Sequence, residues 1–129
     1  MAFLASVGCG SSQKKVVPSE EFRGDIRALA SFAAESRLFI AFVQNGHATK
    51  AYAHEHPLYQ AKEIAESKKK LDAAIAAPGF EARLNEARQV AARLQNALQS
   101  LSESSPDYSS LNNELQSLQD EAERLRQAQ

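Results

Sequence analysis

Residues 80–125, FEARLNEARQVAARLQNALQSLSESSPDYSSLNNELQSLQDEAERL, contain two successive heptad patterns. In each pattern apolar residues recur at alternating steps of four and three, which places them along one face of a helix. The break between the patterns is short, with Ser105 as the predicted N-cap and Pro106 at the first helical position. We therefore expect two helices, 79–102 and 106–127, that form an antiparallel hairpin with a coiled-coil-like seam. The patterns consist of Phe80, Leu84, Ala87, Ala91, Leu94, Leu98 and Leu101, and of Tyr108, Leu111, Leu115, Leu118, Ala122 and Leu125.

A helix is also predicted over residues 19–45, where apolar residues again follow helical spacing. Ser19 is placed to cap its start, and Asn45-Gly46 to end it, because both residues tolerate the left-handed conformation. The apolar stripe is wide, as in a helix that packs against more than one neighbour. It comprises Phe22, Ile26, Leu29, Ala33, Ser36, Ile40 and Val43, widened by Phe32, Phe39 and Phe42.

Residues 48–77 are helical in pattern but contain Pro57, and a proline inside a helix costs about 3 kcal/mol. Either a second helix spans 48–77 with a kink near Pro57, or the first helix continues through Gly46 and the turn lies at His54–Pro57. The first alternative gives two helices of similar length, about 40 and 45 Å at 1.5 Å per residue, and is preferred. Its expected apolar face comprises Leu58, Ala61, Ile64 or Ala65, Leu71 and Ile75.

The chain of 129 residues is long enough for one domain with a real core. Helix-forming residues dominate, and no alternating β-branched run predicts a strand. The predicted fold is all-α: an antiparallel up-down four-helix bundle over residues 18–129, preceded by a flexible N-terminal tail, residues 1–17. The net charge of −1 provides no general basic field, so no nucleic-acid partner is expected.

Cys9, the only cysteine, lies in the stretch LASVGCGSS, residues 4–12. This stretch resembles the lipobox of bacterial lipoproteins, in which a small residue precedes a cysteine that becomes the mature N-terminus. The resemblance implies lipid attachment at Cys9, with Ser6, Val7 and Gly8 as the signal-cleavage context. It also implies a location in the bacterial cell envelope, with the protein anchored in the membrane and facing the periplasm or the exterior.

A signal peptide has a charged start and an apolar run of about 7–15 residues, and no Lys or Arg precedes Cys9 here. The lipobox interpretation therefore expects the true start to lie upstream of Met1. The alternative is a free thiol in an N-terminal tail, in a protein that stays in the cytoplasm.

The three histidines, His47, His54 and His56, lie close together in the sequence. On a continuous helix His47 and His54 would share a face, which suggests a metal or haem site. The alternative is three solvent-facing or turn histidines beside Pro57. The spacing of Tyr52 and Tyr59 around Pro57 could likewise place them in a small pocket with Phe39 or Phe42, although core packing is the more common role of such a stripe.

No nucleophile, phosphate-binding loop or paired catalytic carboxylate stands out, so we expect no enzyme and no cofactor. Residues 103–129 carry six acids against two arginines, and Lys68–Lys70 or Arg83, Arg88 and Arg93 could pair with them. The leading hypothesis is a small lipid-anchored, non-catalytic helical protein of the bacterial envelope with a structural or interaction role. The alternatives are a metal- or haem-binding bundle and a soluble coiled-coil adaptor that pairs with a partner, or with itself, through helices 79–127.

Overall fold

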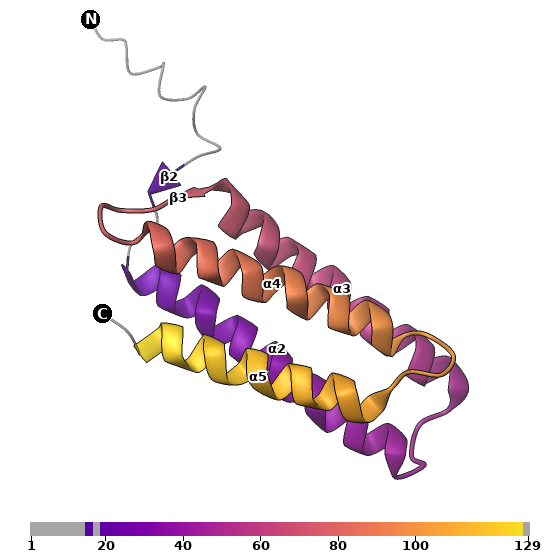
Figure 1. Ribbon diagram of the computed structural model, residues 1–129. Helices are drawn as coiled ribbons and strands as arrows, with labels where there is room; N and C mark the ends of the chain where they lie inside the picture. Colours follow the sequence, from indigo (N-terminus) through magenta and orange to yellow (C-terminus); the bar gives the residue numbers. More distant parts are fainter. Residues whose placement is uncertain (1–14, 17–18, 128–129) are drawn as a thin grey trace, which may run out of the picture.

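The computed structural model describes residues 15–16 and 19–127, and within them the chain forms the predicted antiparallel four-helix bundle (Figure 1). Helices α2 and α3 form one layer, and helices α4 and α5 form the other. Contacts are most extensive between the layers, where α2 packs on α5 and α3 on α4. The helices are α2 (Ser19–Gln44), α3 (Lys50–Ala73), α4 (Glu81–Leu101) and α5 (Tyr108–Gln127).

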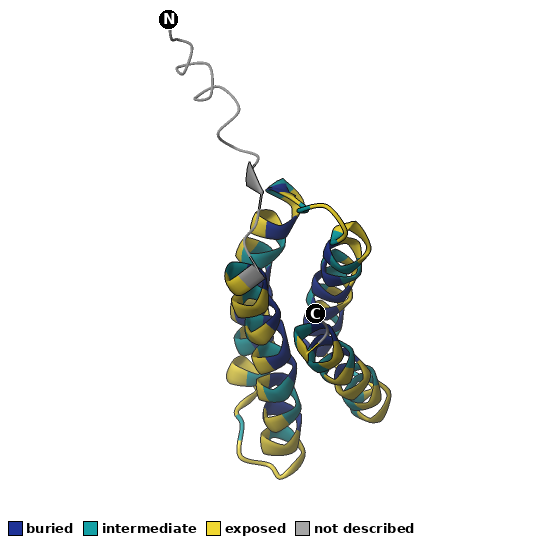
Figure 2. Cartoon of the chain, turned by 90° about the vertical axis from the view of Figure 1, so that its left-hand side faces the viewer, coloured by how far each residue is buried: buried dark blue, intermediate teal, exposed yellow. Residues whose placement is uncertain are grey.

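The core lies between the two layers, where buried residues line the facing sides of the helices (Figure 2). The heptad patterns supply about half of its large side chains, and Leu94, Leu98 and Leu118 among them are fully buried. In α2 most of the predicted stripe is also buried, but Phe32 and Val43 are only half-buried and Phe42 is exposed. Ser36 fits within the stripe because its Oγ donates a hydrogen bond of 2.8 Å to the carbonyl of Phe32. The apolar faces of both heptad helices therefore pack against other helices of the same chain.

Helix α3 contributes less to the core than its sequence pattern predicts. Ala61, Ile64 and Leu71 are buried, but Leu58 and Ile75 are exposed. The α2–α3 contact is correspondingly less extensive than the contacts between the layers. The edge of the bundle between these two helices is therefore its least packed side.

The first inter-helix turn lies at Asn45-Gly46, as predicted. Gly46 has φ of 77°, the Gly46 amide donates to the carbonyl of Val43, and the His47 amide donates to that of Phe42. This pair of bonds is the Schellman arrangement, which satisfies carbonyls left free at a helix end. Thr49 then caps α3 by accepting a hydrogen bond from the Tyr52 amide, and α3 continues through Pro57 as one helix.

Helix α3 ends at Ala73, four residues earlier than predicted. Ala74–Ile75 instead forms a short strand, β3, that pairs in parallel with β2, Lys15–Val16, a part of the chain predicted to be a linker. The guanidinium of Arg88 donates 2.9 Å bonds to the carbonyls of Leu71 and Ala74. These contacts stabilise the helix end, because the last carbonyls of a helix have no partners within it.

The last two helices also begin later than predicted. Pro78-Gly79 forms the turn before α4, with Gly79 at φ of 88°. The predicted capping role of Ser105 is wrong, because α5 begins after Asp107, whose carboxylate accepts a 3.1 Å hydrogen bond from the Ser110 amide.

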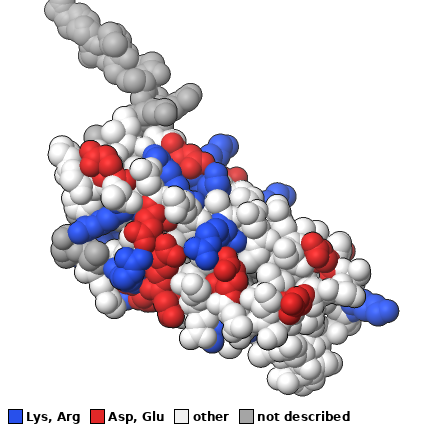
Figure 3. Space-filling model, viewed as in Figure 1, with Lys and Arg blue, Asp and Glu red and all other residues white. Residues whose placement is uncertain are grey.

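Charged side chains of both signs alternate over the outer surface of α4 and α5 (Figure 3). Arg93 binds both carboxylate oxygens of Glu114, at 3.1 and 3.2 Å, and lies 3.4 Å from Glu121, which confirms one of the predicted pairings with the acidic helix. Arg124 pairs with Glu86 and lowers the pKa of that carboxyl. Burial, and then the nearby Glu86, raise the pKa of Glu121.

The other basic residues pair elsewhere. Lys68 binds Asp72 within α3 at 2.8 Å, and Lys70 lies 3.7 Å from Asp25 of α2. Burial raises the pKa of Asp25 in spite of the attraction of Lys70. The lysine run therefore packs against its own layer and not against α5.

Candidate functional site: an aromatic pocket between α2 and α3

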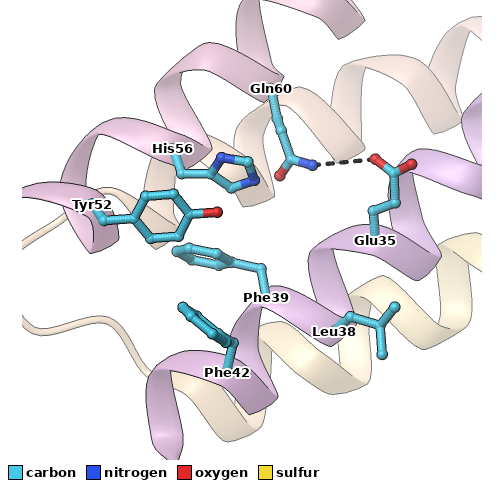
Figure 4. Close-up of a pocket in the computed structure, with 7 residues that line it drawn as sticks. All are labelled: Glu35, Leu38, Phe39, Phe42, Tyr52, His56 and Gln60. Carbon is cyan, nitrogen blue, oxygen red and sulfur yellow. Dashed lines mark hydrogen bonds between the residues drawn. The ribbon is translucent and has the colours of Figure 1, made fainter. Parts of the chain in front are cut away.

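A pocket of about 350 Å³ opens on the weakly packed α2–α3 edge (Figure 4). Helix α2 contributes residues spaced by three and four, so that they share one helix face. Helix α3 contributes residues spaced by four, for the same reason. The lining residues are Glu35, Leu38, Phe39 and Phe42 of α2, and Tyr52, His56 and Gln60 of α3.

Four rings form a continuous cluster along this edge. The Tyr52 and His56 rings stack with centroids 4.9 Å apart, and His56 stacks on Phe39 at 5.2 Å. Phe42 meets Tyr52 edge to face at 5.9 Å. Such offset and edge-to-face pairs contribute about 0.5–1.5 kcal/mol beyond the burial of their area. Phe42 and Tyr52 each remain 43% exposed and Leu38 71% exposed, so the cluster presents an apolar surface to solvent.

The other end of the pocket is polar. Gln60 is only 5% exposed, and its Nε2 donates a long hydrogen bond of 3.4 Å to Oε1 of Glu35. The Oε1 atom of Gln60 is buried and has no hydrogen-bond partner among the described residues. A buried polar atom without a partner is uncommon and destabilising. Glu35 is the one lining residue with a full charge, and none of the described Lys or Arg residues forms an ion pair with it.

The structure separates the three histidines. His47 precedes α3, so it shares no helix face with His54, and its ring lies 5.4 Å from that of Phe42. His54 Nδ1–H donates a 2.7 Å bond to the carbonyl of Ser102 at the end of α4. His56 belongs to the aromatic cluster. Among residues 15–16 and 19–127 no group of three His, Cys, Asp or Glu side chains is placed to hold a metal ion.

The sequence predicts only some of the residues that line the aromatic pocket. The predicted pocket residues Phe39, Phe42 and Tyr52 line it, whereas Tyr59 is exposed and is not among its lining residues. Glu35 and Gln60 were missed, because single polar residues on helices usually face solvent. Their only sequence signal is position: Glu35 lies four residues before Phe39, and Gln60 four after His56.

A second hollow of about 560 Å³ lies beneath the two loops at the same end of the bundle. Its lining residues include Val43, Ala53, His54, Ser102 and Tyr108. The hydrogen bond from His54 to Ser102 joins two of these lining residues and links the end of α4 to the first half of α3.

Cys9 and its predicted cleavage context, Ser6, Val7 and Gly8, lie outside the described residues. Among the helices that are described, none combines the length and apolar character needed to span a bilayer. Comparisons of the chain with protein-family models, with curated proteins and with solved structures found no match.

Proposed function

We propose that the protein is a non-catalytic interaction module of the bacterial cell envelope, anchored to the membrane by lipid at Cys9. The observation that carries the binding role is the exposed aromatic cluster on the α2–α3 edge. Clustered exposed aromatic side chains are typical of binding sites, whereas scattered apolar residues are common on any surface. The anchor rests on the resemblance of LASVGC to a lipobox.

The position of the pocket is consistent with a tethered binding module. The chain enters the bundle at β2, beside the start of α2 and the end of α3 (Figure 1). Phe39 lies about 30 Å along α2 from Ser19, at 1.5 Å per residue. The six residues from Cys9 to Lys15 reach at most about 20 Å. An anchor at Cys9 would therefore hold the β2–β3 end near the membrane and direct the pocket away from it.

The alternative of a coiled-coil adaptor receives less support from the packing. Leu84, Leu94 and Leu98 of α4 are buried within the bundle, as are Leu115 and Leu118 of α5. A partner that paired through this seam would first have to open the two-layer core. The α2–α3 edge, in contrast, is accessible without any rearrangement.

Membrane fractionation of a bacterial host that expresses the full chain with its natural upstream DNA tests the anchor. We expect the protein in the membrane fraction, and Cys9→Ser to move most of it into the soluble fraction. Ser11→Ala serves as the matched control and should not change the distribution. Intact mass spectrometry should show acylation of the unmutated protein. A soluble, unmodified wild-type protein would refute the anchor.

A further inference from the structure

The aromatic pocket has two chemically distinct ends. The antiparallel register of α2 and α3 determines which residues face one another at each end. Glu35 is opposite Gln60, Phe39 is opposite His56, and Phe42 is opposite Tyr52. Glu35 and Phe42 are seven residues apart, or about 10 Å along the helix. A ligand that fills the pocket lengthwise therefore meets a carboxylate at one end and aromatic rings at the other (Figure 4).

The polar end has the chemistry to accept a cation that donates hydrogen bonds. Glu35 supplies negative charge, and the buried Oε1 of Gln60 is an acceptor with no donor in the part of the chain that the structure describes. Among the described residues, the Gln60 amide is held by the 3.4 Å bond to Glu35 alone, so a competing N–H group can replace this bond and turn Oε1 toward itself. An ammonium group has three N–H donors and can serve both acceptors. Hydrogen bonds to charged groups are roughly twice as strong as neutral ones.

The aromatic end has the chemistry to accept an apolar body. Leu38, Phe42 and Tyr52 expose apolar surface that a hydrocarbon chain would cover, and this burial is favourable at about 25 cal/mol per Å². No Lys or Arg is among the described lining residues, so the pocket disfavours anions.

We infer that the pocket between α2 and α3 binds an amphipathic primary amine, with its ammonium at Glu35 and Gln60 and its apolar chain along Phe39, His56, Phe42 and Tyr52. This ligand class does not depend on the lipid anchor, and its test is separate from membrane fractionation. The pocket is shallow and open, so affinity in the range of about 0.1–1 mM is expected, or about 4–5.5 kcal/mol.

Titration of the ¹⁵N-labelled full chain with three six-carbon probes tests the inference by amide chemical shifts. Hexylammonium should bind saturably and shift the amides of Phe39, Phe42, Tyr52 and His56. 1-Hexanol, of the same length but neutral, should bind about tenfold more weakly, and hexanoate more weakly still. The tenfold ratio corresponds to about 1.4 kcal/mol.

Two variants and a control assign the contacts. Glu35→Gln should abolish the preference for the amine over the alcohol, and Tyr52→Ala should weaken both probes about tenfold. Glu66→Gln removes the same charge from an exposed position of α3 outside the pocket and should have no effect. Circular dichroism identifies any variant that has lost its fold, and Glu35→Asp then provides a milder change. Equal affinity for the three probes, an unchanged amine preference in Glu35→Gln, or no saturation by hexylammonium up to 10 mM would each overturn the inference.

Discussion

Gly24 within α2 and Gly46 in the turn that follows it show how the same residue type has opposite effects at two positions. Gly24 lies within the helix, and a Cβ built on it meets nothing within 4 Å. Glycine there only adds conformational entropy to the unfolded chain. Gly46 has φ of 77°, a conformation that side chains with a Cβ rarely adopt, and it completes the turn that directs α3 back along α2.

Alanine substitutions at the two glycines should therefore change stability in opposite directions. Gly24→Ala is expected to raise the free energy of unfolding by about 0.5–1 kcal/mol. Gly46→Ala is expected to lower it by about 1–2 kcal/mol, since alanine is strained at positive φ. Urea denaturation followed by circular dichroism measures both. A gain in stability in Gly46→Ala would show that the turn does not need its left-handed residue.

At the level of the helices, local sequence predicts where an element begins or ends only when the determinants are local. Asn45-Gly46 forms the predicted end of α2, because the Schellman bonds involve only neighbouring residues. The end of α3 could not be predicted in this way. It depends on Lys15–Val16 and on Arg88, which are distant in the sequence and come together only in the fold.

Arg88 should therefore contribute to stability from α4 by holding the end of α3. Arg88→Met keeps much of the aliphatic stem but removes both hydrogen bonds to carbonyls, and we expect a loss of about 1–2 kcal/mol in the free energy of unfolding. Arg23→Met, on the exposed face of α2, is the matched control and should change stability by less than about 0.5 kcal/mol. Equal effects of the two substitutions in chemical denaturation would contradict the proposed cap.

In the molecule as a whole, the strict heptads of α4 and α5 predicted the bundle correctly, because apolar periodicity determines which faces must be buried. The pocket followed from the sequence only in part. Phe39 and Tyr52 can be recognised as pocket candidates from the sequence, because they are aromatic residues at helical spacing. Glu35 and Gln60 acquire a role only through the register of two antiparallel helices, which periodicity within either helix does not specify.

The uneven packing predicts uneven protection from hydrogen exchange. In the first half of α3 the only buried residue is Pro57 among residues 50–59, whereas α4 buries Val90, Ala91, Leu94, Ala97 and Leu98. The amides of residues 54–56, 58 and 59 should exchange at least about tenfold faster than those of residues 90–98, because weakly packed segments open locally. Exchange measured by NMR at neutral pH checks this. Uniform protection of both segments would show that the bundle opens only as one unit.

The parallel pairing of β2 with β3 has a mechanical consequence. A force applied to the chain before Lys15 reaches the backbone bonds between Lys15–Val16 and Ala74–Ile75 before it reaches the first turn of α2. The load passes from there into the segment between α3 and α4, where Arg88 secures the end of α3. The pairing joins two residues of each strand, so it can separate without unfolding any helix. Under such a force the strand pair would separate before the helices of the core bear the load.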